Sequence, residues 1–553
     1  MPNFLENIFA QLERAGDRVV LREIRDGQFR SVTGRELLER VAGIRAYLRS
    51  AGLQTGERCA VLAPNSIHWA ALDLALMAEG IVVVPLYARQ SVAELTAMIR
   101  DARPRAVFLE DAALGEEIAR AGCECLARVL IPEALPGGTG AAAIGNKPNP
   151  RSDEELVAII YTSGTSGEPK GVCLSTANLT FMVSRTTERL NLLMGATREP
   201  DRIFLYAPLN FAASWMLMLT AFSRESALTL STDLTKLADE IRLSAPHYFL
   251  NVPTLLERVK RGVEENIAGR GAAIRVLYNR ARSAWERRRA GRTGAFDGLW
   301  LRLGRELIFK KIKARFGPNL RALICGSAPL APETQLFFLM LGIPVLQAYG
   351  LTETTALCTL DDPRAPAEPG CVGPAIEGVE MRLGDNDEIL VRGPNVFPGY
   401  WNRPEETAKV MRDGWFHTGD QGERNARGNW RIVGRIKNLI VLNSGHKFAP
   451  EPIEDKLATM IPLAQHVVLV GNGRGAVCVL ITGKVESAAA QAAIDALNPE
   501  LPHYRQIRNF ALIREPFGTD SGLLTAMGKL KRDAIAARFA AEIDAMYGRK
   551  ATA

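Results

Sequence analysis

CxxC pairs are absent from this sequence. Its eight cysteines are scattered, and none forms a CxxC pair or joins a histidine at zinc-binding spacing. This excludes a disulfide-stapled scaffold and a cysteine-based zinc site, and it predicts reduced thiols in a cytoplasmic protein. The first residues, MPNFLENIFAQLERAGDR, contain early acidic side chains and no apolar run before a cleavage site. No signal peptide is therefore expected.

A large excess of one charge is also absent. The 68 Lys and Arg residues against 61 Asp and Glu residues give a net charge of +7 over 553 residues. This excess is too small to indicate a nucleic-acid-binding surface by itself, and no nucleic-acid partner is expected. The hydrophobic fraction of 47% and the charged fraction of 23% are typical of globular proteins, without a long low-complexity tract. The length predicts about two to four structural units.

One uncharged stretch, Ile203–Ser223, is long enough to span a bilayer. Pro208 and Asn210 interrupt it near its middle. The pattern instead predicts a buried strand at Arg202–Ala207, a turn, and a buried helix from about Ala213.

Short runs rich in Val and Ile alternate with helical patterns through about the first 400 residues. This alternation predicts an α/β fold with parallel sheets. A turn-rich sequence, GDND, separates two short strand patterns near residues 378–393 and indicates a small β subdomain. We expect a large N-terminal α/β domain and a small α+β C-terminal domain joined by a hinge. The expected boundaries are 1–433 with the β subdomain at about 370–433, a hinge at 434–438, and 439–553.

The most informative segment is Tyr161–Gly171, YTSGTSGEPKG, which follows a buried strand pattern. Its glycines and hydroxyl residues allow backbone N–H groups to approach phosphate oxygens closely. It lacks the GxxxxGK[ST] spacing of a Walker loop, and the alternative is a solvated Ser/Gly turn. The predicted phosphate-binding residues are Thr162, Ser163, Gly164, Thr165, Ser166, Gly167 and Lys170.

Five motifs in order resemble those of the adenylate-forming (AMP-binding) superfamily, most closely its long-chain fatty acyl-CoA synthetase branch. The phosphate loop is the first, and the others are QAYGLTET at 347–354, GWFHTGD at 414–420, the region GRIKNLIVLNSGHKFAPEPIE at 434–454, and GKLKR at 528–532. The resemblance implies ATP and Mg²⁺ as cofactors, with CoA as the co-substrate.

The resemblance also implies roles for individual side chains. Tyr349 supplies a ring for adenine and is followed by Gly350, while Thr352 supplies a hydroxyl near the α-phosphate and Glu353 a ligand for Mg²⁺. A turn that lines the adenine pocket corresponds to Gly326, Ser327 and Ala328.

The later motifs supply the remaining polar groups. Asp420 corresponds to the residue that binds the ribose, and Arg435 assists it. Lys529 corresponds to the catalytic lysine that neutralises charge at the α-phosphate. The hinge position falls on Lys437, and the thiol-delivery face on Ser444, Gly445 and His446.

The acyl pocket is predicted at an apolar segment that includes Phe211, Trp215 and Met216. No aspartate stands in Phe204–Thr220 to bind a substrate ammonium, so an amino acid is not the expected substrate. Three residues depart from the pattern of the family, because Thr176 and Phe211 replace histidines and Asn438 replaces an acidic residue. A medium-chain or branched acid therefore stays open beside a long-chain acid.

Together these features predict a ligase of fatty acid metabolism, an AMP-forming acyl-CoA synthetase. It would activate a medium- or long-chain fatty acid to an acyl-adenylate with release of pyrophosphate, and then transfer the acyl group to CoA. The alternative is an enzyme of specialised metabolism that activates another acid or passes the acyl group to a carrier protein, an amine or water. The sequence indicates no oligomeric state.

A basic segment precedes the strand at 322–325. Residues 258–315 hold 17 Lys and Arg against 5 Asp and Glu, a local charge of +12, with Trp285, Phe296, Leu299 and Trp300 interleaved. This combination suits peripheral contact with an anionic membrane, which would place the protein at the inner membrane face. A solvated helical face and an RNA-binding patch are the alternatives.

Overall fold

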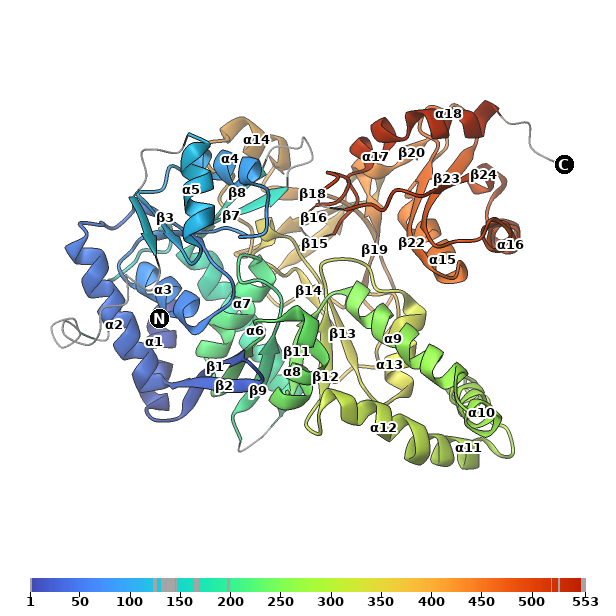
Figure 1. Cartoon of the computed structure of the whole chain (residues 1–553), viewed down its shortest axis with the longest axis horizontal. Coiled ribbons are helices and arrows are strands. Elements are labelled where there is room, and N and C mark those ends of the chain that lie inside the picture. Colours follow the sequence, from blue (N-terminus) through green and yellow to red (C-terminus); the bar gives the residue numbers. More distant parts are fainter. Residues whose placement is uncertain are drawn as a thin grey trace. The chain divides into compact units, whose positions relative to one another are not determined.

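The computed structural model describes residues 2–122, 127–130, 145, 147–163, 169–195, 199–518, 520–525 and 528–548. The chain divides into two compact units. Unit 1 consists of Met1–Glu380, Val391–Phe416 and Ala426–Trp430, and unit 2 of Met381–Leu390, His417–Asn425 and Arg431–Ala553. The elements are labelled in Figure 1.

The first sheet of unit 1 has eight strands in the order β14-β13-β12-β11-β9-β10-β1-β2. Neighbours from β13 to β1 are parallel, whereas β14 and β2 pair antiparallel at the two edges. The inner strands are continuous runs of buried residues because parallel sheets are covered on both faces. The strands are β1 (Val19–Arg25), β2 (Gln28–Thr33), β9 (Asp201–Leu205), β10 (Ser226–Leu230), β11 (Tyr248–Asn251), β12 (Ala322–Cys325), β13 (Val345–Tyr349) and β14 (Thr359–Leu360).

The second sheet of unit 1 has six strands in the order β6-β5-β3-β4-β7-β8. All of its pairs are parallel except β7 with β8. Helices α3 (Ile67–Ala78) and α4 (Val92–Ala102) connect its central strands, as the alternating sequence pattern predicts. The strands are β3 (Arg58–Leu62), β4 (Val82–Pro85), β5 (Ala106–Leu109), β6 (Ala127–Leu130), β7 (Leu156–Ser163) and β8 (Pro169–Ser175).

Other helices pack around these sheets (Figure 1). Helix α1 begins with a capping box, in which Asn3 and Glu6 bind each other's backbone N–H groups. The helices are α1 (Phe4–Ala15), α2 (Gly34–Ser50), α5 (Ala112–Arg120), α6 (Thr176–Met194), α7 (Ala212–Phe222), α8 (Leu237–Ser244), α13 (Pro332–Met340) and α14 (Pro404–Val410).

The uncharged stretch Ile203–Ser223 forms β9 and then α7, so the prediction of a buried strand followed by a buried helix is confirmed. Almost every residue of α7 is buried. In the described part of the chain, no helix is both long enough and apolar enough to cross a membrane.

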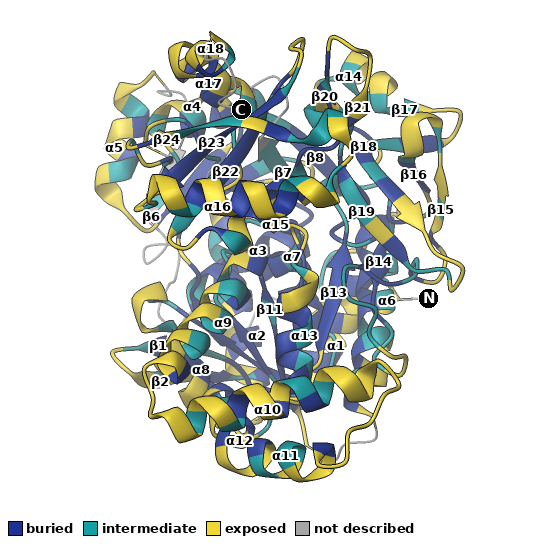
Figure 2. Ribbon diagram, turned by 90° about the vertical axis from the view of Figure 1, so that its right-hand side faces the viewer, coloured by how far each residue is buried: buried dark blue, intermediate teal, exposed yellow. Residues whose placement is uncertain are grey.

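The basic segment forms a group of helices between β11 and β12. It contains α9 (Pro253–Ala268), α10 (Ala272–Arg289), α11 (Asp297–Gly304), a π-helical turn at Arg305–Phe309, and α12 (Lys310–Lys313). Figures 1 and 2 show α10 and α11 side by side at the periphery of unit 1. Tyr278 of α10 meets Phe309 edge to face at 6.5 Å between ring centroids, which attaches the group to a buried core cluster.

Five strands after residue 379 form the predicted small β region. Their order is β15-β16-β18-β17, with β19 also pairing with β18. The strands are β15 (Glu380–Leu383), β16 (Glu388–Arg392), β17 (Met411–Arg412), β18 (Trp415–Arg424) and β19 (Trp430–Arg435).

After residue 435, unit 2 contains the two-stranded sheet β20-β21 and a three-stranded sheet, β22-β23-β24, with helices on both faces (Figure 2). Successive residues of a strand point to opposite faces, so Val467 and Leu469 join one core cluster whereas Val468 joins another. The first cluster includes residues of α15 and α16, and the second includes residues of α17 and α18. The elements are β20 (Ile440–Val441), β21 (Lys447–Phe448), α15 (Glu451–Met460), β22 (Ala464–Val470), β23 (Val477–Gly483), α16 (Ser487–Leu497), β24 (Ile507–Ile513), α17 (Arg532–Arg538) and α18 (Ala540–Gly548).

Candidate functional site

Two predicted nucleotide-binding segments leave the same edge of the first sheet. Residues Gly326–Ala328 follow β12, and Tyr349–Glu353 begin at the end of β13, its parallel neighbour. The Gly326 N–H donates to the Asn251 carbonyl oxygen at 3.2 Å, which holds the turn against β11. A Cβ on Gly326 would lie 3.2 Å from the Ala348 oxygen, so the turn also lies close to β13. Ligands bind at the carboxyl ends of parallel strands in open α/β sheets.

The loop after β13 is tightly constrained. A Cβ on Gly350 would lie 2.1 Å from the Ala356 oxygen, so no larger residue fits without movement of the backbone. The Leu351 N–H donates to Thr354 Oγ1 at 2.9 Å, and Thr355 Oγ1 donates to the Asn395 oxygen at 2.7 Å. These contacts fix the short 3₁₀ turn Thr352–Thr354, which carries two of the predicted site residues.

The predicted phosphate loop connects β7 and β8, which are antiparallel neighbours. Thr162 pairs with Lys170 across this hairpin. Gly164, Thr165, Ser166 and Gly167, together with the Ser163 side chain, lie outside the described residues. Before the loop, the Tyr161 hydroxyl donates to Asp101 Oδ2 at 2.6 Å, and burial followed by this hydrogen bond raises the pKa of Tyr161.

One tyrosine connects the phosphate-loop lysine with the predicted metal ligand. The Tyr400 hydroxyl donates to Glu353 Oε1 at 2.8 Å, and Lys170 Nζ lies 5.3 Å from the centroid of the Tyr400 ring. Lys170 Nζ also lies 2.6 Å from Glu406 Oε2. The hydrogen bonds from Lys170 and Lys409 lower the pKa of Glu406 to about 2, so this carboxylate is charged at neutral pH. Unit 1 thus places a cation, a phenol and a carboxylate in one cluster.

Sequence reasoning missed both Tyr400 and Glu406. The segment that carries Tyr400 lies along β8, since the Trp401 N–H donates to the Gly171 oxygen at 2.7 Å and the Cys173 N–H to the Gly399 oxygen at 3.1 Å. The available signal was a Pro-Gly turn followed by two aromatic residues at 398–401. That signal indicates a turn but does not show which strand it contacts.

Asp420 and Arg435 form an ion pair within unit 2. Arg435 Nε lies 2.9 Å from Asp420 Oδ1, and Asp420 is buried. Thr418 orients the turn before Asp420, because its hydroxyl accepts the Asp420 N–H at 3.0 Å and donates to the Ile389 oxygen at 2.8 Å. The structure therefore brings together the two residues predicted for ribose binding.

The predicted hinge lysine lies in a 3₁₀ turn, Ile436–Asn438, directly after β19. Burial, followed by the charge of Arg435, lowers the pKa of Lys437. Asn438 Nδ2 donates to Glu451 Oε1 at 2.7 Å, which connects this turn to the start of α15.

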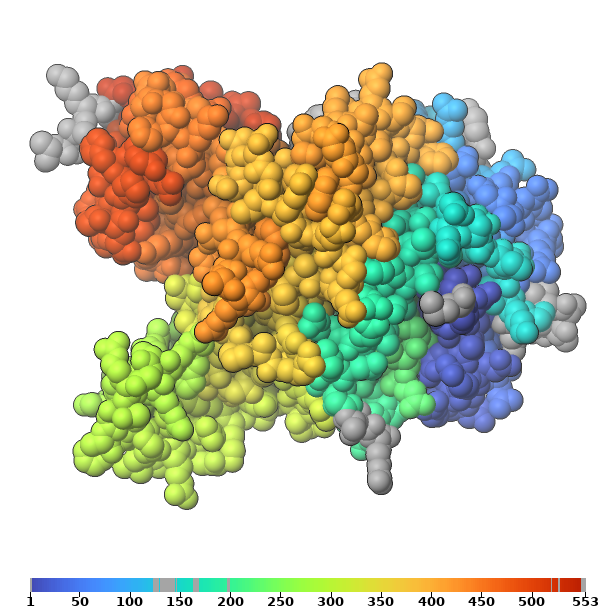
Figure 3. Space-filling view, turned by 180° about the vertical axis from the view of Figure 1, so that it is seen from behind, coloured from blue at the N-terminus to red at the C-terminus, as the bar shows by residue number. Residues whose placement is uncertain are grey.

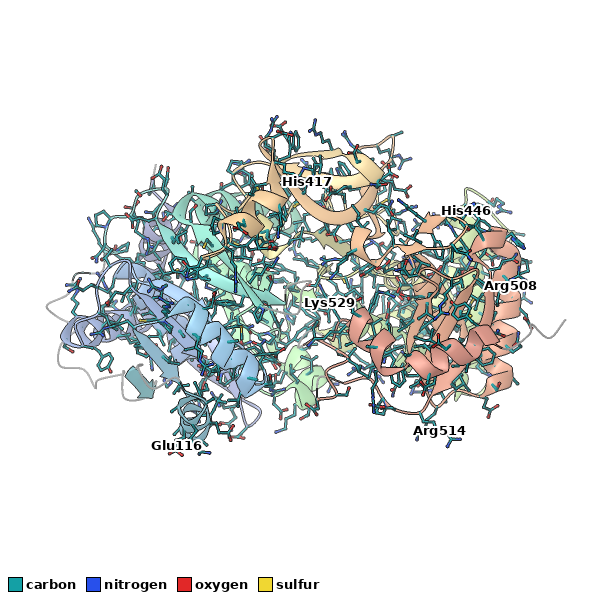
Figure 4. The ribbon with its side chains drawn as sticks, turned by 90° about the horizontal axis from the view of Figure 1, so that it is seen from above. Glu116, His417, His446, Arg508, Arg514 and Lys529 are labelled. Atoms are coloured by element: carbon teal, nitrogen blue, oxygen red, sulfur yellow. The ribbon has the colours of Figure 1, made fainter. Side chains whose placement is uncertain are left out.

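Lys529 lies on the loop before α17 (Figure 4). Its N–H donates to Thr525 Oγ1 at 3.1 Å, and its carbonyl oxygen accepts the Thr525 N–H at 2.8 Å. Three residues later, Arg532 pairs with the buried carboxylate of Glu454 and holds the start of α17. The backbone of the lysine loop is thus fixed to unit 2, while the Lys529 side chain is exposed.

The predicted thiol face is an exposed turn between β20 and β21. Ser444 Oγ lies 3.0 Å from His446 Nδ1, and the imidazole of His446 stacks on Tyr504 at 4.1 Å between ring centroids. Gly445 has a φ of +84°, which other residues rarely adopt. Figure 4 shows His446 and Lys529 on different parts of unit 2.

The predicted acyl-pocket residues lie at the start of α7 and within it. Phe211 is half-buried and meets the Tyr87 ring at 5.9 Å between centroids, whereas Trp215 and Met216 are buried. The Trp215 Nε1 donates to Asp73 Oδ2 at 2.8 Å, and burial raises the pKa of Asp73 to about 7. Their role in acyl binding stays a prediction.

Mg²⁺ would need few protein ligands at this site, because substrate phosphates and water usually supply the others. Among the described residues, no group of three or more His, Cys, Asp or Glu side chains could hold a metal ion. Mg²⁺ is usually bound by one or two carboxylates together with substrate phosphates and water, rather than by a cage of protein ligands. Glu353, oriented by Tyr400, offers one such carboxylate.

Comparison with known proteins places these features in a family. A family model described as "AMP-binding enzyme" matches residues 8–401, and a model of the "AMP-binding enzyme C-terminal domain" matches residues 437–551. The chain is 29% identical to "Long-chain-fatty-acid--CoA ligase FadD15" of Mycobacterium bovis, covering 97% of this chain and 95% of the relative. It is 28% identical to "Long chain acyl-CoA synthetase 1" of Arabidopsis thaliana, covering 95% and 89%.

Solved structures share the fold over nearly the whole chain. ATP-bound MatB from Rhodopseudomonas palustris has a TM-score of 0.74 at 24% identity, covering 97% of this chain and 99% of that one. MenE from Bacillus subtilis in complex with AMP also gives 0.74, at 19% identity, covering 96% and 98%. Because both family models match in order and the first alone covers most of the chain, this chain belongs to the AMP-binding enzymes, the adenylate-forming superfamily.

Proposed function

We propose that this enzyme activates a medium- or long-chain fatty acid with ATP and transfers the acyl group to CoA. The observation that carries the proposal is the match of both AMP-binding family models, together with relatives named as fatty acyl-CoA ligases along nearly the full chain. The cluster of Lys170, Tyr400 and Glu353 supports the ATP-dependent step, because it combines a phosphate-binding cation with an oriented carboxylate.

In the first step, a carboxylate oxygen of the acid attacks the α-phosphorus of ATP. A new P–O bond forms, the bond to the bridging oxygen of the β-phosphate breaks, and pyrophosphate leaves with the electron pair. No protein nucleophile is needed, so the enzyme contributes orientation and charge neutralisation. Bound Mg²⁺ would neutralise phosphate charge, and Glu353 would hold it.

The residues of this step have complementary roles in the proposal. Tyr349 would stack on adenine beside the turn at Gly326–Ala328, and Thr352 would donate to the α-phosphate. Asp420 would accept hydrogen bonds from the ribose hydroxyls, with Arg435 orienting it at 2.9 Å. Lys529 would place its ammonium group against the charge that develops at the α-phosphate.

In the second step, the CoA thiolate attacks the acyl carbon of the adenylate. A C–S bond forms, the acyl C–O bond to AMP breaks, and AMP leaves. We propose that unit 2 presents Lys529 in the first step and the turn Ser444–His446 in the second, with residues 434–438 as the hinge between domains 1–433 and 439–553. The separation of Lys529 and His446 on unit 2 supports two distinct faces (Figure 4).

The apolar character of α7 supports an alkyl substrate. The residues of α7 carry no charge. The half-buried Phe211, which contacts Tyr87, lies at the N-terminal end of this helix. Burial of a methylene group contributes about 0.8 kcal/mol, so an apolar pocket favours longer chains over acetate. Phe211 would narrow or reshape the acyl site, so a medium-chain or branched acid is a candidate beside a long-chain acid.

The experiment measures pyrophosphate release by the purified chain with acetate, octanoate, palmitate, benzoate and leucine, each with and without CoA. We expect the largest value of kcat/KM with octanoate or palmitate, and a mass-spectrometric signal for the acyl-CoA only when CoA is present. Pyrophosphate release with leucine or benzoate, but not with octanoate or palmitate, would contradict the fatty-acid assignment. Adenylate formation with octanoate or palmitate but without acyl-CoA would assign the acyl group to another acceptor.

A further inference from the structure

The basic helices of unit 1 carry a charge that their own acids do not neutralise. Four of the five acids in residues 258–315 pair locally. Glu264 and Glu286 pair with Arg282, Asp297 pairs with Arg287, and Glu306 pairs with Lys310. At least ten further arginines and lysines of the segment are exposed and form no ion pair among the described residues. The segment therefore presents a strongly positive surface to solvent.

Large apolar side chains are exposed among these charges. Phe296 is 68% exposed, more than any other large apolar side chain in the described part of the chain. Leu299, Val276 and Leu307 are 52%, 53% and 47% exposed. Trp285 packs against a core cluster and both Trp285 and Trp300 are half-buried, so Phe296 and Leu299 are the more exposed of the four.

The apolar and basic residues occupy the same few elements. Phe296 and Leu299 lie at the start of α11, Val276 lies on α10, and Leu307 lies in the π-helical turn. Figure 2 shows long exposed stretches along α10 and α11, and Figure 3 shows the yellow-green atoms of this segment gathered in one lobe of unit 1. In these elements, apolar side chains would enter a bilayer interface while neighbouring arginines bind lipid phosphates.

We propose that the surface formed by α10, α11 and the π-helical turn docks this enzyme on an anionic lipid bilayer. The charge complements an anionic surface, since the segment carries +12 whereas the rest of the chain carries −5. The exposed apolar side chains favour a bilayer over a nucleic acid, because aliphatic groups such as Leu299 contribute nothing to phosphate binding in RNA but gain free energy in the lipid interface. The proposal does not depend on which acid the enzyme activates.

The test is sedimentation of the full chain with vesicles of phosphatidylcholine, alone or mixed with phosphatidylglycerol. Binding to the mixed vesicles is expected at low salt and should be lost at about 1 M salt, where the Debye length falls to about 3 Å. The triple variant Arg280→Glu, Arg288→Glu, Arg292→Glu should weaken binding about 100-fold or more, because each basic residue near the surface contributes substantially. These three substitutions do not change Arg287 or Asp297, so the ion pair between those residues is retained.

Matched controls separate this surface from net charge and from folding. Reversal of Arg14, Arg40 and Arg514, which are exposed outside the segment, changes the net charge equally and should leave binding within about 3-fold. Phe296→Ser with Leu299→Ser should weaken vesicle binding without changing charge, whereas Leu192→Ser with Leu243→Ser should not. Adenylation of a short soluble acid should be retained by every variant, which shows that the fold is intact.

Three results would overturn the proposal. Equal binding to neutral vesicles would remove the role of the charge, and absence of binding to either vesicle would leave a solvated helical surface. The third result is that oligouridylate binds as tightly as anionic vesicles do, and that the Phe296 and Leu299 changes affect neither binding. That result would identify a general polyanion-binding surface instead.

Discussion

At the scale of the residue, Tyr400 contacts two side chains that have different proposed tasks. Its hydroxyl donates to Glu353, and its ring lies against the ammonium of Lys170. A carboxylate has two oxygens with about four lone-pair sites, so a hydrogen bond from a phenol orients the group without occupying every site. Tyr400 is therefore a positioning residue, and its hydroxyl and ring can be tested separately.

Tyr400→Phe removes the hydroxyl and keeps the ring. We expect the Mg²⁺ concentration that gives half-maximal ATP–pyrophosphate exchange to rise about 5- to 10-fold, because Glu353 loses a hydrogen bond worth about 1–1.5 kcal/mol. The measurement is exchange over a Mg²⁺ titration. Tyr278→Phe is the matched control, since the buried Tyr278 hydroxyl has no partner among the described residues. An unchanged Mg²⁺ dependence in Tyr400→Phe would show that Glu353 does not rely on this contact.

Lys529 is the other residue whose role can be isolated. Lys529→Ala should lower adenylate formation by about 100-fold or more, the scale of losing one strong electrostatic stabiliser of a transition state. Thioester formation from a supplied acyl-adenylate should fall much less, because the α-phosphate is no longer attacked in that step. Lys531→Ala, two residues away, controls for loss of a positive charge on the same loop. Exchange near the wild-type rate in Lys529→Ala would transfer the role to another group.

At the scale of the element, α3 and α7 meet through a buried carboxyl group. Asp73 on α3 is fully buried and accepts the Trp215 indole N–H, and its Oδ1 has no partner among the described residues. Burial raises the pKa of Asp73 from 3.8 to about 7. Since the pKa in the folded state is higher than in the unfolded chain, this group favours the folded state at low pH, and that contribution is lost as the pH rises through about 7.

Asp73→Asn should remove this pH dependence. Between about pH 4 and pH 7, the free energy of unfolding of the wild type should fall relative to that of the variant by about 4 kcal/mol at most. Urea unfolding followed by tryptophan fluorescence at several pH values measures this difference. Asp239→Asn, at an exposed position on α8, should show no such divergence. Parallel pH profiles for wild type and Asp73→Asn would mean that the Asp73 carboxyl titrates normally.

The elements themselves were largely predictable, but the contacts between them were not. Continuous apolar runs rich in Val predict buried parallel strands, and the structure has them in the second sheet, as β4 and β5. The pairing of Asp73 with Trp215 joins residues 142 positions apart, and α7 is apolar on all sides, so no periodicity shows which face meets α3. Tyr400 was missed for the same reason, because strand pairing with β8 depends on tertiary structure.

At the scale of the whole molecule, each unit has its own hydrophobic core. Leu323 of β12 belongs to a cluster of unit 1, and Leu457 of α15 belongs to a cluster of unit 2. Both side chains are completely buried. Compact units with separate cores are expected to unfold as separate cooperative transitions.

The matched pair Leu323→Ala and Leu457→Ala tests this division. Each change removes the same three carbon atoms, Cγ and the two Cδ methyl groups, from a full core, and should cost about 2–5 kcal/mol of stability. In differential scanning calorimetry of the full chain, we expect Leu457→Ala to lower the midpoint of one transition and Leu323→Ala to lower that of the other. Since Lys529 belongs to unit 2, Leu457→Ala should also lose adenylation at a lower temperature than wild type. Equal displacement of every transition by either variant would mean that the two cores unfold as one cooperative structure.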